Sequence, residues 1–288
     1  MGQYSIKDLE VLSGIKAHTL RIWEQRYKIV EPKRTDTNIR YYTDEQLKTI
    51  LNVSVLNSSG RKISKIASLT SKEIAHEVLA MNQEHLNEGV YINQLVEGMI
   101  CLDKKLILNI LKRSEDFDTL TDFFLKVVFP FLGRVGMLWS SNSINPGQEH
   151  FASNIIKRFL FNKIENLTEP KSDAPMFLLF LPEGDWHELS LLVAEYILKN
   201  NGNRVLYLGA SVPDSDVKAI LSLTKIDYLL CVSILSQPIV SIQNTINRIA
   251  ELSHPVALMF AGRAFYHPDL KYPKAARIIY SFEDLGVS

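Results

Sequence analysis

The sequence predicts a multi-domain α + α/β fold: a winged helix-turn-helix, a helical bundle and a doubly wound parallel-sheet domain of Rossmann-like type. Three observations predict it. Two short helical segments joined at a glycine and followed by a turn-rich stretch occupy residues 1–72. Amphipathic helices succeed one another over residues 84–168. Strands and helices alternate over residues 172–288, which is typical of a parallel sheet.

The composition excludes several classes of protein. Of 288 residues, 46% are apolar and 22% are charged, which argues against a disordered tail, a collagen-like chain and a bulk polycation. Cys101 and Cys231 are the two cysteines, too few for a disulfide framework or a Cys₄ zinc site. Apolar runs fall short of the roughly 20 residues of a membrane helix. The first residues lack a basic region followed by an apolar one, so we expect a cytoplasmic protein without membrane contact.

The charge is unevenly distributed along the chain. The formal net charge is zero, with 32 basic and 32 acidic residues, yet residues 1–70 contain 12 Lys/Arg against 7 Asp/Glu. A basic segment on an acidic body favours local contact with a polyanion, although a solvated surface would give the same count.

The first two helices are predicted from apolar faces. Residues 4–12 carry an apolar residue at every third position, and Gly14 supplies the positive φ that ends a helix. Residues 16–27 form the second helix, and such a pair is a helix-turn-helix. The apolar faces consist of Ile6, Leu9 and Leu12 in the first helix and Leu20, Trp23 and Tyr27 in the second.

A β-hairpin wing is predicted over residues 31–42, where two basic clusters flank a turn-rich middle. Further helices follow from Thr43 and Gly60. Hydrogen-bond donors on the second helix and the wing suit phosphate and base contacts, although Lys16 and His18 are open to a merely solvated role. The candidate DNA-binding residues are Lys16, His18, Thr19, Arg21, Arg34, Arg40 and Tyr41.

The order of these segments resembles the winged helix-turn-helix of the MerR family of transcription regulators. The resemblance is carried by the runs Tyr4–Leu9, Thr19–Tyr27 and Arg40–Tyr42. It implies a dimer that binds a pseudo-palindromic promoter in double-stranded DNA and distorts it.

The middle of the chain is predicted as a bundle of helices over residues 71–81, 84–102, 104–114, 119–138 and 146–162. The first of them has two readings, a bundle member or a connector that serves dimerisation. Pro130 should bend the fourth helix. Trp139 precedes a polar turn, and Glu149 and His150 follow on the next helix. Taken alone, these residues are typical of a boundary Trp and a solvated pair.

Apolar runs predict buried parallel strands in the last part. Ligands of such sheets bind outside the carboxyl ends of the strands, where Asp185 and His187 follow the first run. A carboxylate there can hold an imidazole in its metal-ligating tautomer. A GxGxxG fingerprint and a P-loop lysine motif are absent. The predicted strands cover 176–181, 205–208 (ended by Gly209), 228–234, 256–260 and 277–280, and the helices cover 189–199, 214–223 and 241–252.

These strand ends resemble the cobalamin-binding domain of methionine synthase and the mutases, whose motifs are Asp-x-His-x-x-Gly, Ser-x-Leu and Gly-Gly. The resemblance implies that His187 binds cobalt as the lower axial ligand while the bundle caps the upper face. Trp139 followed after nine residues by Glu149-His150 resembles the cap of the CarH and LitR photoreceptor regulators. The implied cofactor-binding residues are Trp139, Glu149, His150, Asp185, His187, Ser190, Ser233, Leu235 and Gly262.

Three positions depart from these motifs. Ser190 and Ala261 replace glycines near the expected nucleotide tail, and Ser140 stands where the light-sensing relatives have a histidine. Ser140 therefore gives no support to a second imidazole ligand after photolysis.

The hypothesis that results is a DNA-binding repressor, not an enzyme, whose adenosylcobalamin state controls oligomerisation and DNA affinity. Light that breaks the Co–C bond is the switch implied by the resemblance. Homo-oligomers, a dimer on DNA or a tetramer, are expected. One alternative is a regulator whose cobalamin-like domain has lost the cofactor and serves partner binding or oligomerisation. A remote one is a cobalamin-carrying methyltransferase or mutase subunit, for which no catalytic barrel remains in the chain.

Overall fold

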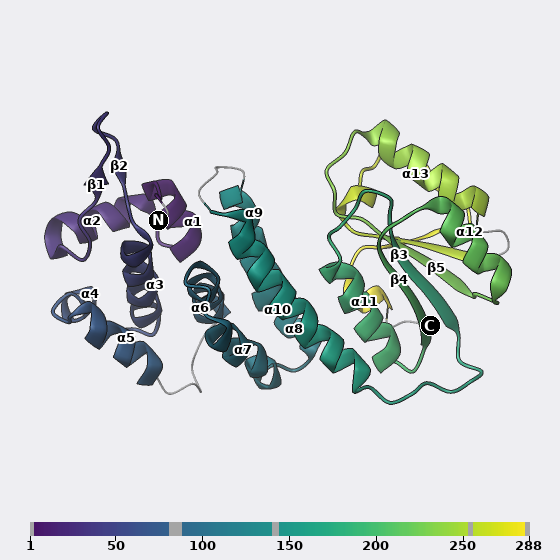
Figure 1. Ribbon diagram of the computed structural model, residues 1–288, viewed down its shortest axis with the longest axis horizontal. Helices are drawn as coiled ribbons and strands as arrows, with labels where there is room; N and C mark the ends of the chain where they lie inside the picture. Colours follow the sequence, from purple (N-terminus) through teal and green to yellow (C-terminus); the bar gives the residue numbers. More distant parts are fainter. Residues whose placement is uncertain (1–2, 81–87, 140–143, 253–255, 286–288) are drawn as a thin grey trace. The chain divides into compact units, whose positions relative to one another are not determined.

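The computed structural model describes residues 3–80, 88–139, 144–252 and 256–285. They form two compact units, Met1–Ile156 and Lys157–Ser288, and each is described by itself (Figure 1). The predicted combination of helix-turn-helix, bundle and parallel sheet is confirmed. Among the described residues, no helix is both long and apolar enough to cross a membrane.

The helix-turn-helix begins the first unit. Helix α1 covers Ile6–Ser13, and its start is fixed by a capping box in which Ser5 and Asp8 exchange side-chain and backbone hydrogen bonds. Gly14 ends the helix with φ +75°, as the sequence predicts. Helix α2 follows at Ala17–Tyr27.

The wing and three helices complete the reader, which is the name used here for residues 3–80. Strands β1 (Lys33–Arg34) and β2 (Arg40–Tyr41) pair antiparallel and form the predicted hairpin, which projects from the unit (Figure 1). The next elements are α3 (Asp44–Ser58), α4 (Ile63–Ile66) and α5 (Ser71–Ala80). Helix α5 packs against α3, so it belongs to the reader.

The bundle comprises α6 (Glu88–Ile100), α7 (Lys104–Lys112), the 3₁₀ turn η2 (Arg113–Asp116), α8 (Leu120–Phe123), the π-helical segment η3 (Phe124–Val128) and α9 (Phe129–Trp139). The predicted single helix over 119–138 is thus a continuous helical run with a π-helical segment in it. Pro130 has no N–H for an α-helical hydrogen bond, and η3 accommodates the missing bond just before it. Helix α10 covers Pro146–Glu165, and the division between the units falls within it.

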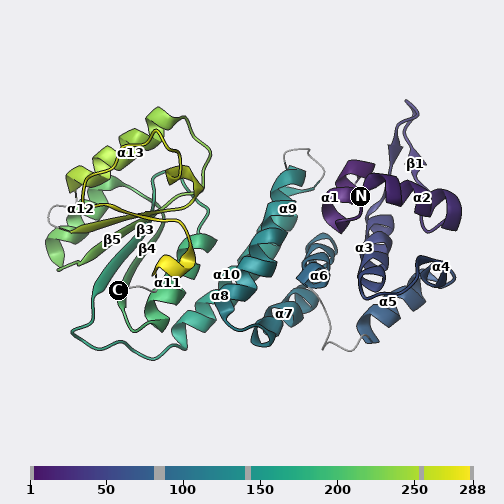
Figure 2. The ribbon, with the colours of Figure 1, turned by 180° about the vertical axis from the view of Figure 1, so that it is seen from behind.

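The second unit contains a five-stranded parallel sheet in the order β4-β3-β5-β6-β7. Helix α11 covers one face of the sheet, and α12 and α13 cover the other (Figure 2). The elements are β3 (Met176–Pro182), α11 (Leu189–Asn200), β4 (Arg204–Val212), α12 (Asp214–Leu223), β5 (Tyr228–Val232), α13 (Ile239–Leu252), β6 (Ala257–Ala261), η4 (Arg263–Phe265), β7 (Arg277–Ile279) and η5 (Phe282–Leu285).

The predicted end of the second strand at Gly209 is wrong. Strand β4 continues to Val212 through a register shift against β3, and Gly209 adopts φ +87° within it. An isolated glycine in a strand marks such an irregularity as readily as a strand end.

Candidate functional site

A hydrogen-bonded group of three side chains lies at the carboxyl ends of β3 and β5, two neighbouring strands. Asp185 is fully buried, and its Oδ1 accepts hydrogen bonds from the backbone N–H of His187 and from Nδ1 of that ring, both at 3.0 Å. Its Oδ2 accepts the hydroxyl of Ser233 at 2.7 Å. The structure therefore brings together Asp185, His187 and Ser233, which the sequence predicts as one site.

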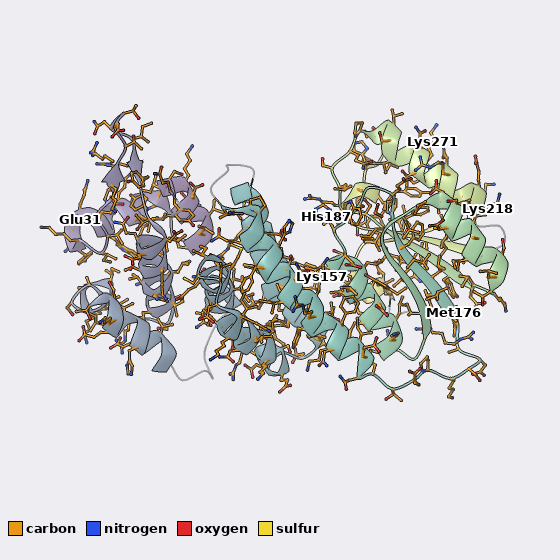
Figure 3. All side chains as sticks on the ribbon, in the orientation of Figure 1. Glu31, Lys157, Met176, His187, Lys218 and Lys271 are labelled. Carbon is orange, nitrogen blue, oxygen red and sulfur yellow. The ribbon has the colours of Figure 1, made fainter. Side chains whose placement is uncertain are left out.

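The protonation of this group follows from its contacts. Burial alone would raise the pKa of Asp185, but the hydrogen bonds from His187 and Ser233 outweigh it and lower that pKa below its ordinary value. Asp185 is therefore an ionised acceptor, which places the proton of the His187 ring on Nδ1. Nε2 is then the nitrogen with a lone pair for a metal. The side chain of His187 is 53% exposed, so a ligand can reach it (Figure 3).

Ser211 fixes the loop that carries His187, a role that the sequence analysis missed. Its hydroxyl accepts the backbone N–H of Gly184 at 3.0 Å, and its own N–H donates to the carbonyl of Asp185 at 2.9 Å. Ser211 adopts φ +54°, unusual for a non-glycine residue. The run Gly209-Ala210-Ser211 at a strand end was the available signal.

Gly262 supports the group from the next strand. A Cβ at this position would overlap the carbonyl oxygen of Ser233, and φ is +97°. The N–H of Ser233 also donates to the carbonyl of Ala261 at 3.0 Å. Leu235 and Ser190 are half-buried nearby in sequence, Ser190 in the first turn of α11.

Glu188 ties the same loop to two further elements, and sequence reasoning missed it as well. Its carboxylate accepts the hydroxyl of Tyr207 on β4 at 3.0 Å and pairs with Lys157 of α10 at 3.1 Å. Burial, followed by the charge of Glu188, raises the pKa of Tyr207. The position of Glu188 directly after His187, the predicted metal ligand, was the signal that the sequence offered.

The predicted cap lies in the first unit. Nδ1 of His150 lies 3.0 Å from a carboxylate oxygen of Glu149 on α10, and the His150 side chain is 71% exposed. Trp139 ends α9, but its side chain lies outside the described residues, as does Ser140. Because His187 belongs to the other unit, the capping role of these residues stays a prediction.

Cavities in the second unit are unequal. The one beside Asp185 and Ser233 has a volume of about 30 Å³, which is room for about one water molecule. Another of about 530 Å³ lies between residues 167–174 and 199–202, away from the predicted site. Within the described residues, no group of three or more His, Cys, Asp and Glu side chains could hold a metal ion by itself.

The second helix of the reader presents a polar face with donors. Leu20 and Trp23 are buried as core, while His18 and Arg21 are exposed. Exposed Ile22, Gln25 and Arg26 share that face, which helical spacing from His18 could have revealed. The predicted contacts Lys16 and Thr19 are already partnered: Lys16 pairs with Glu10 at 3.1 Å, and Thr19 is half-buried with its hydroxyl 3.3 Å from His18 Nε2.

The wing presents basic side chains beside this face. Arg34 and Arg40 are exposed, and Arg34 donates to the side-chain oxygen of Asn38 at 2.7 Å. Tyr41 is half-buried. The hydroxyl of buried Tyr42 bonds to Glu24 of α2, and this bond ties the wing to the second helix.

Comparisons with known proteins agree with this layout. Residues 4–73 match the MerR HTH family regulatory protein model, and residues 91–161, which cover most of the bundle, match the B12 binding domain model. The HTH-type transcriptional repressors CarH and CarA of Myxococcus xanthus are 25% and 29% identical to the chain. These matches cover 86% and 72% of it and 84% and 68% of the relatives. A monomethylamine corrinoid protein of Methanosarcina barkeri aligns with a TM-score of 0.51 at 18% identity over 69% of this chain and 92% of its own, and so shares the fold.

These matches confirm the predicted resemblance to MerR-family regulators with a cobalamin-binding domain, CarH among them. The names of both repressors describe regulators rather than enzymes, in line with the prediction of a non-enzymatic protein.

Proposed function

We propose that this protein is a cobalamin-dependent transcriptional repressor. The chain contains a MerR HTH domain and a B12-binding domain and is homologous to CarH and CarA. Adenosylcobalamin is the proposed form, and its state would set oligomerisation and promoter affinity. One observation carries the proposal. The same chain holds a donor-rich recognition helix and a half-exposed imidazole oriented by a buried carboxylate.

The residues at the strand ends fit the metal side of this cofactor. His187 would supply Nε2 as a ligand of cobalt, and Asp185, itself bonded to Ser233, would orient the ring through its hydrogen bond to Nδ1. When bound, the cofactor would supply a Co–C bond that light can break. The cavity of about 30 Å³ is too small for a nucleotide base, so the segments that line it would have to separate on binding.

DNA binding would use the exposed face of α2 in the major groove and the wing on the backbone. His18 and Arg21 would reach base edges or phosphates, and Arg34 and Arg40 would contact phosphates. A homodimer would place two such faces on the half-sites of a pseudo-palindrome.

Cofactor binding is tested with full-length protein that is mixed with adenosylcobalamin in the dark and passed through gel filtration. The wild type should retain the corrinoid with the spectrum of an imidazole-ligated cobalt, and His187→Ala should lose that spectrum. His267→Ala is the matched control, because His267 also neighbours a carboxylate, Asp269, in the same unit. Protein that elutes without corrinoid would reject cofactor binding.

A second candidate function is a regulator whose sheet domain holds partners or oligomers without cofactor. The small cavity beside Asp185 favours it, as do Ser190 and Ala261 in place of motif glycines. A mobility shift on the DNA upstream of its own gene, unchanged by cobalamin in darkness and in light, would favour this candidate over the first.

A further inference from the structure

Four polar residues meet where the reader packs against the bundle, within the first unit: three of them by their side chains and Ser13 by its backbone carbonyl. Ser13 ends α1, Ser54 lies on α3, Asn93 on α6 and Arg134 on α9. Ser13, Ser54 and Asn93 are 3%, 7% and 5% exposed, and burial lowers the pKa of Arg134. These four residues are called the seam below. Polar groups this deeply buried are costly unless they are hydrogen-bonded, so their partners show what they hold in place.

The hydrogen bonds of the seam end on the last turn of α1. Nη1 of Arg134 donates to the carbonyl of Leu12 at 3.0 Å and to Oδ1 of Asn93 at 2.7 Å. Nδ2 of Asn93 donates to the hydroxyl of Ser54 at 3.1 Å, and that hydroxyl donates to the carbonyl of Ser13 at 3.0 Å. Two carbonyls that a helix end leaves without helical partners are therefore satisfied from outside the helix. A cation at this end is also favoured by the helix dipole.

The turn between α1 and α2 begins directly after these two carbonyls. The hydroxyl of Ser13 accepts the N–H of Ile15 at 3.2 Å, and Glu10 accepts the N–H of Ala17 at the start of α2 at 3.1 Å. The direction of the recognition helix therefore depends on how the end of α1 is held. Arg134 holds it from the bundle through a direct bond to the carbonyl of Leu12, and it lies on the helix that ends at Trp139.

We propose that Arg134 is a positioning residue for DNA recognition: from the bundle it fixes the turn that orients α2, and it transmits the state of the bundle to the reader. The second clause rests on the proposed function, and the first does not. If the seam only held the fold together, a variant that is still folded would bind DNA as the wild type does. The two roles therefore make different predictions.

The test uses the full-length protein and DNA that the wild type selects from a random library. Arg134→Met removes the donors at similar length. Arg134→Lys keeps an ammonium that can donate to both acceptors of Nη1. Lys126→Met removes a cation whose ion pair, at 3.7 Å to Asp122, stays within the bundle. Dissociation constants are measured at several salt concentrations, without cofactor and with adenosylcobalamin in the dark.

Arg134→Met should raise Kd about tenfold, the size expected for lost hydrogen bonds from a charged group, whereas Arg134→Lys should raise it less than about threefold. Lys126→Met should leave Kd unchanged. The salt dependence should stay that of the wild type, because Arg134 neutralises no phosphate. The ratio of Kd with and without cofactor should move toward one in Arg134→Met.

Other outcomes separate the two proposals. If folded Arg134→Met binds DNA with wild-type Kd, the positioning role is overturned. If the wild type ignores cobalamin while Arg134→Met still weakens DNA binding, the proposed cofactor function fails and the positioning role stands. Should Arg134→Met not fold, Ser54→Ala decides in its place: it removes the bond to the Ser13 carbonyl, and an unchanged Kd would overturn the proposal.

Discussion

Each unit contains a buried group of hydrogen-bonded polar residues: the seam in the first unit and Asp185, His187 and Ser233 in the second. The two groups differ in whether the last residue of the network is buried or exposed. In the seam, every bond described here ends on a backbone carbonyl or on another buried side chain. At the sheet edge, the bonds converge on Asp185 and leave the ring of His187 half exposed. Burial and hydrogen bonding alone therefore do not mark a ligand site. The two groups differ in the exposure of their last member. A network that ends on buried groups fixes the backbone, whereas one that ends on an exposed ring can present that ring to a ligand.

The largest expected effect is the loss of stability of the sheet-edge group in Gly262→Ala. A Cβ there overlaps the carbonyl of Ser233 at a backbone conformation that side chains rarely adopt. The second unit should lose about 3 kcal/mol or more of its unfolding free energy. Gly133→Ala is the matched control, since nothing lies within 4 Å of its Cβ and it sits in a helix. Urea unfolding followed in both variants checks this, and an unchanged midpoint for Gly262→Ala would contradict it.

Asp185→Asn should weaken cobalamin binding roughly 10- to 100-fold, the usual effect of losing the partner of a ligating histidine. An amide cannot accept from both His187 and Ser233 as the carboxylate does. The exposed neighbour Glu183→Gln is the control. Absorbance titration in the dark measures both. Equal affinities would mean that the sheet-edge group, like the seam, is only structural.

Arg21→Ala separates the DNA-facing surface from the seam within one unit. Because Arg21 is exposed on α2 and proposed to contact DNA, its removal should weaken binding about tenfold and reduce the salt slope by about one. Seam variants should leave that slope unchanged. Fluorescence anisotropy across a salt series tests this, and a wild-type slope for Arg21→Ala would remove it from the phosphate contacts.

The smallest effect concerns acid stability. The folded pKa of Asp185 lies below its ordinary value of 3.8, so its contribution is present above that value and is lost as the pH falls through the folded pKa. The unfolding free energy of the second unit should therefore fall more steeply with acid in the wild type than in Asp185→Asn. Denaturant titrations between pH 6 and pH 3 compare them, and parallel curves would contradict the assignment.

Local patterns in the sequence predicted much of this molecule. The positive φ of Gly14 and the apolar runs of the sheet are set by near neighbours along the chain, and both are confirmed. Asp185, His187 and Ser233 were also predictable as a group, because parallel strands bring their carboxyl ends together.

Features that depend on distant partners were missed. Ser211 and Glu188 matter because residues distant in the sequence bond to them, and a local sequence pattern does not identify such partners. Arg134 is the one charged residue in the sequence of α9, but its role requires α1, α3 and α6 to be in place.

The π-helical segment η3 has a consequence for the rotational setting of α9. Each residue of a helix turns the chain by about 100°, so a segment with an altered repeat sets the azimuth of everything that follows. The segment Phe124–Val128 thereby determines which side of α9 faces the reader. Losing a single residue from this stretch would swing the Arg134 guanidinium about a quarter-turn away from Leu12, with no change in the amino acids of either partner.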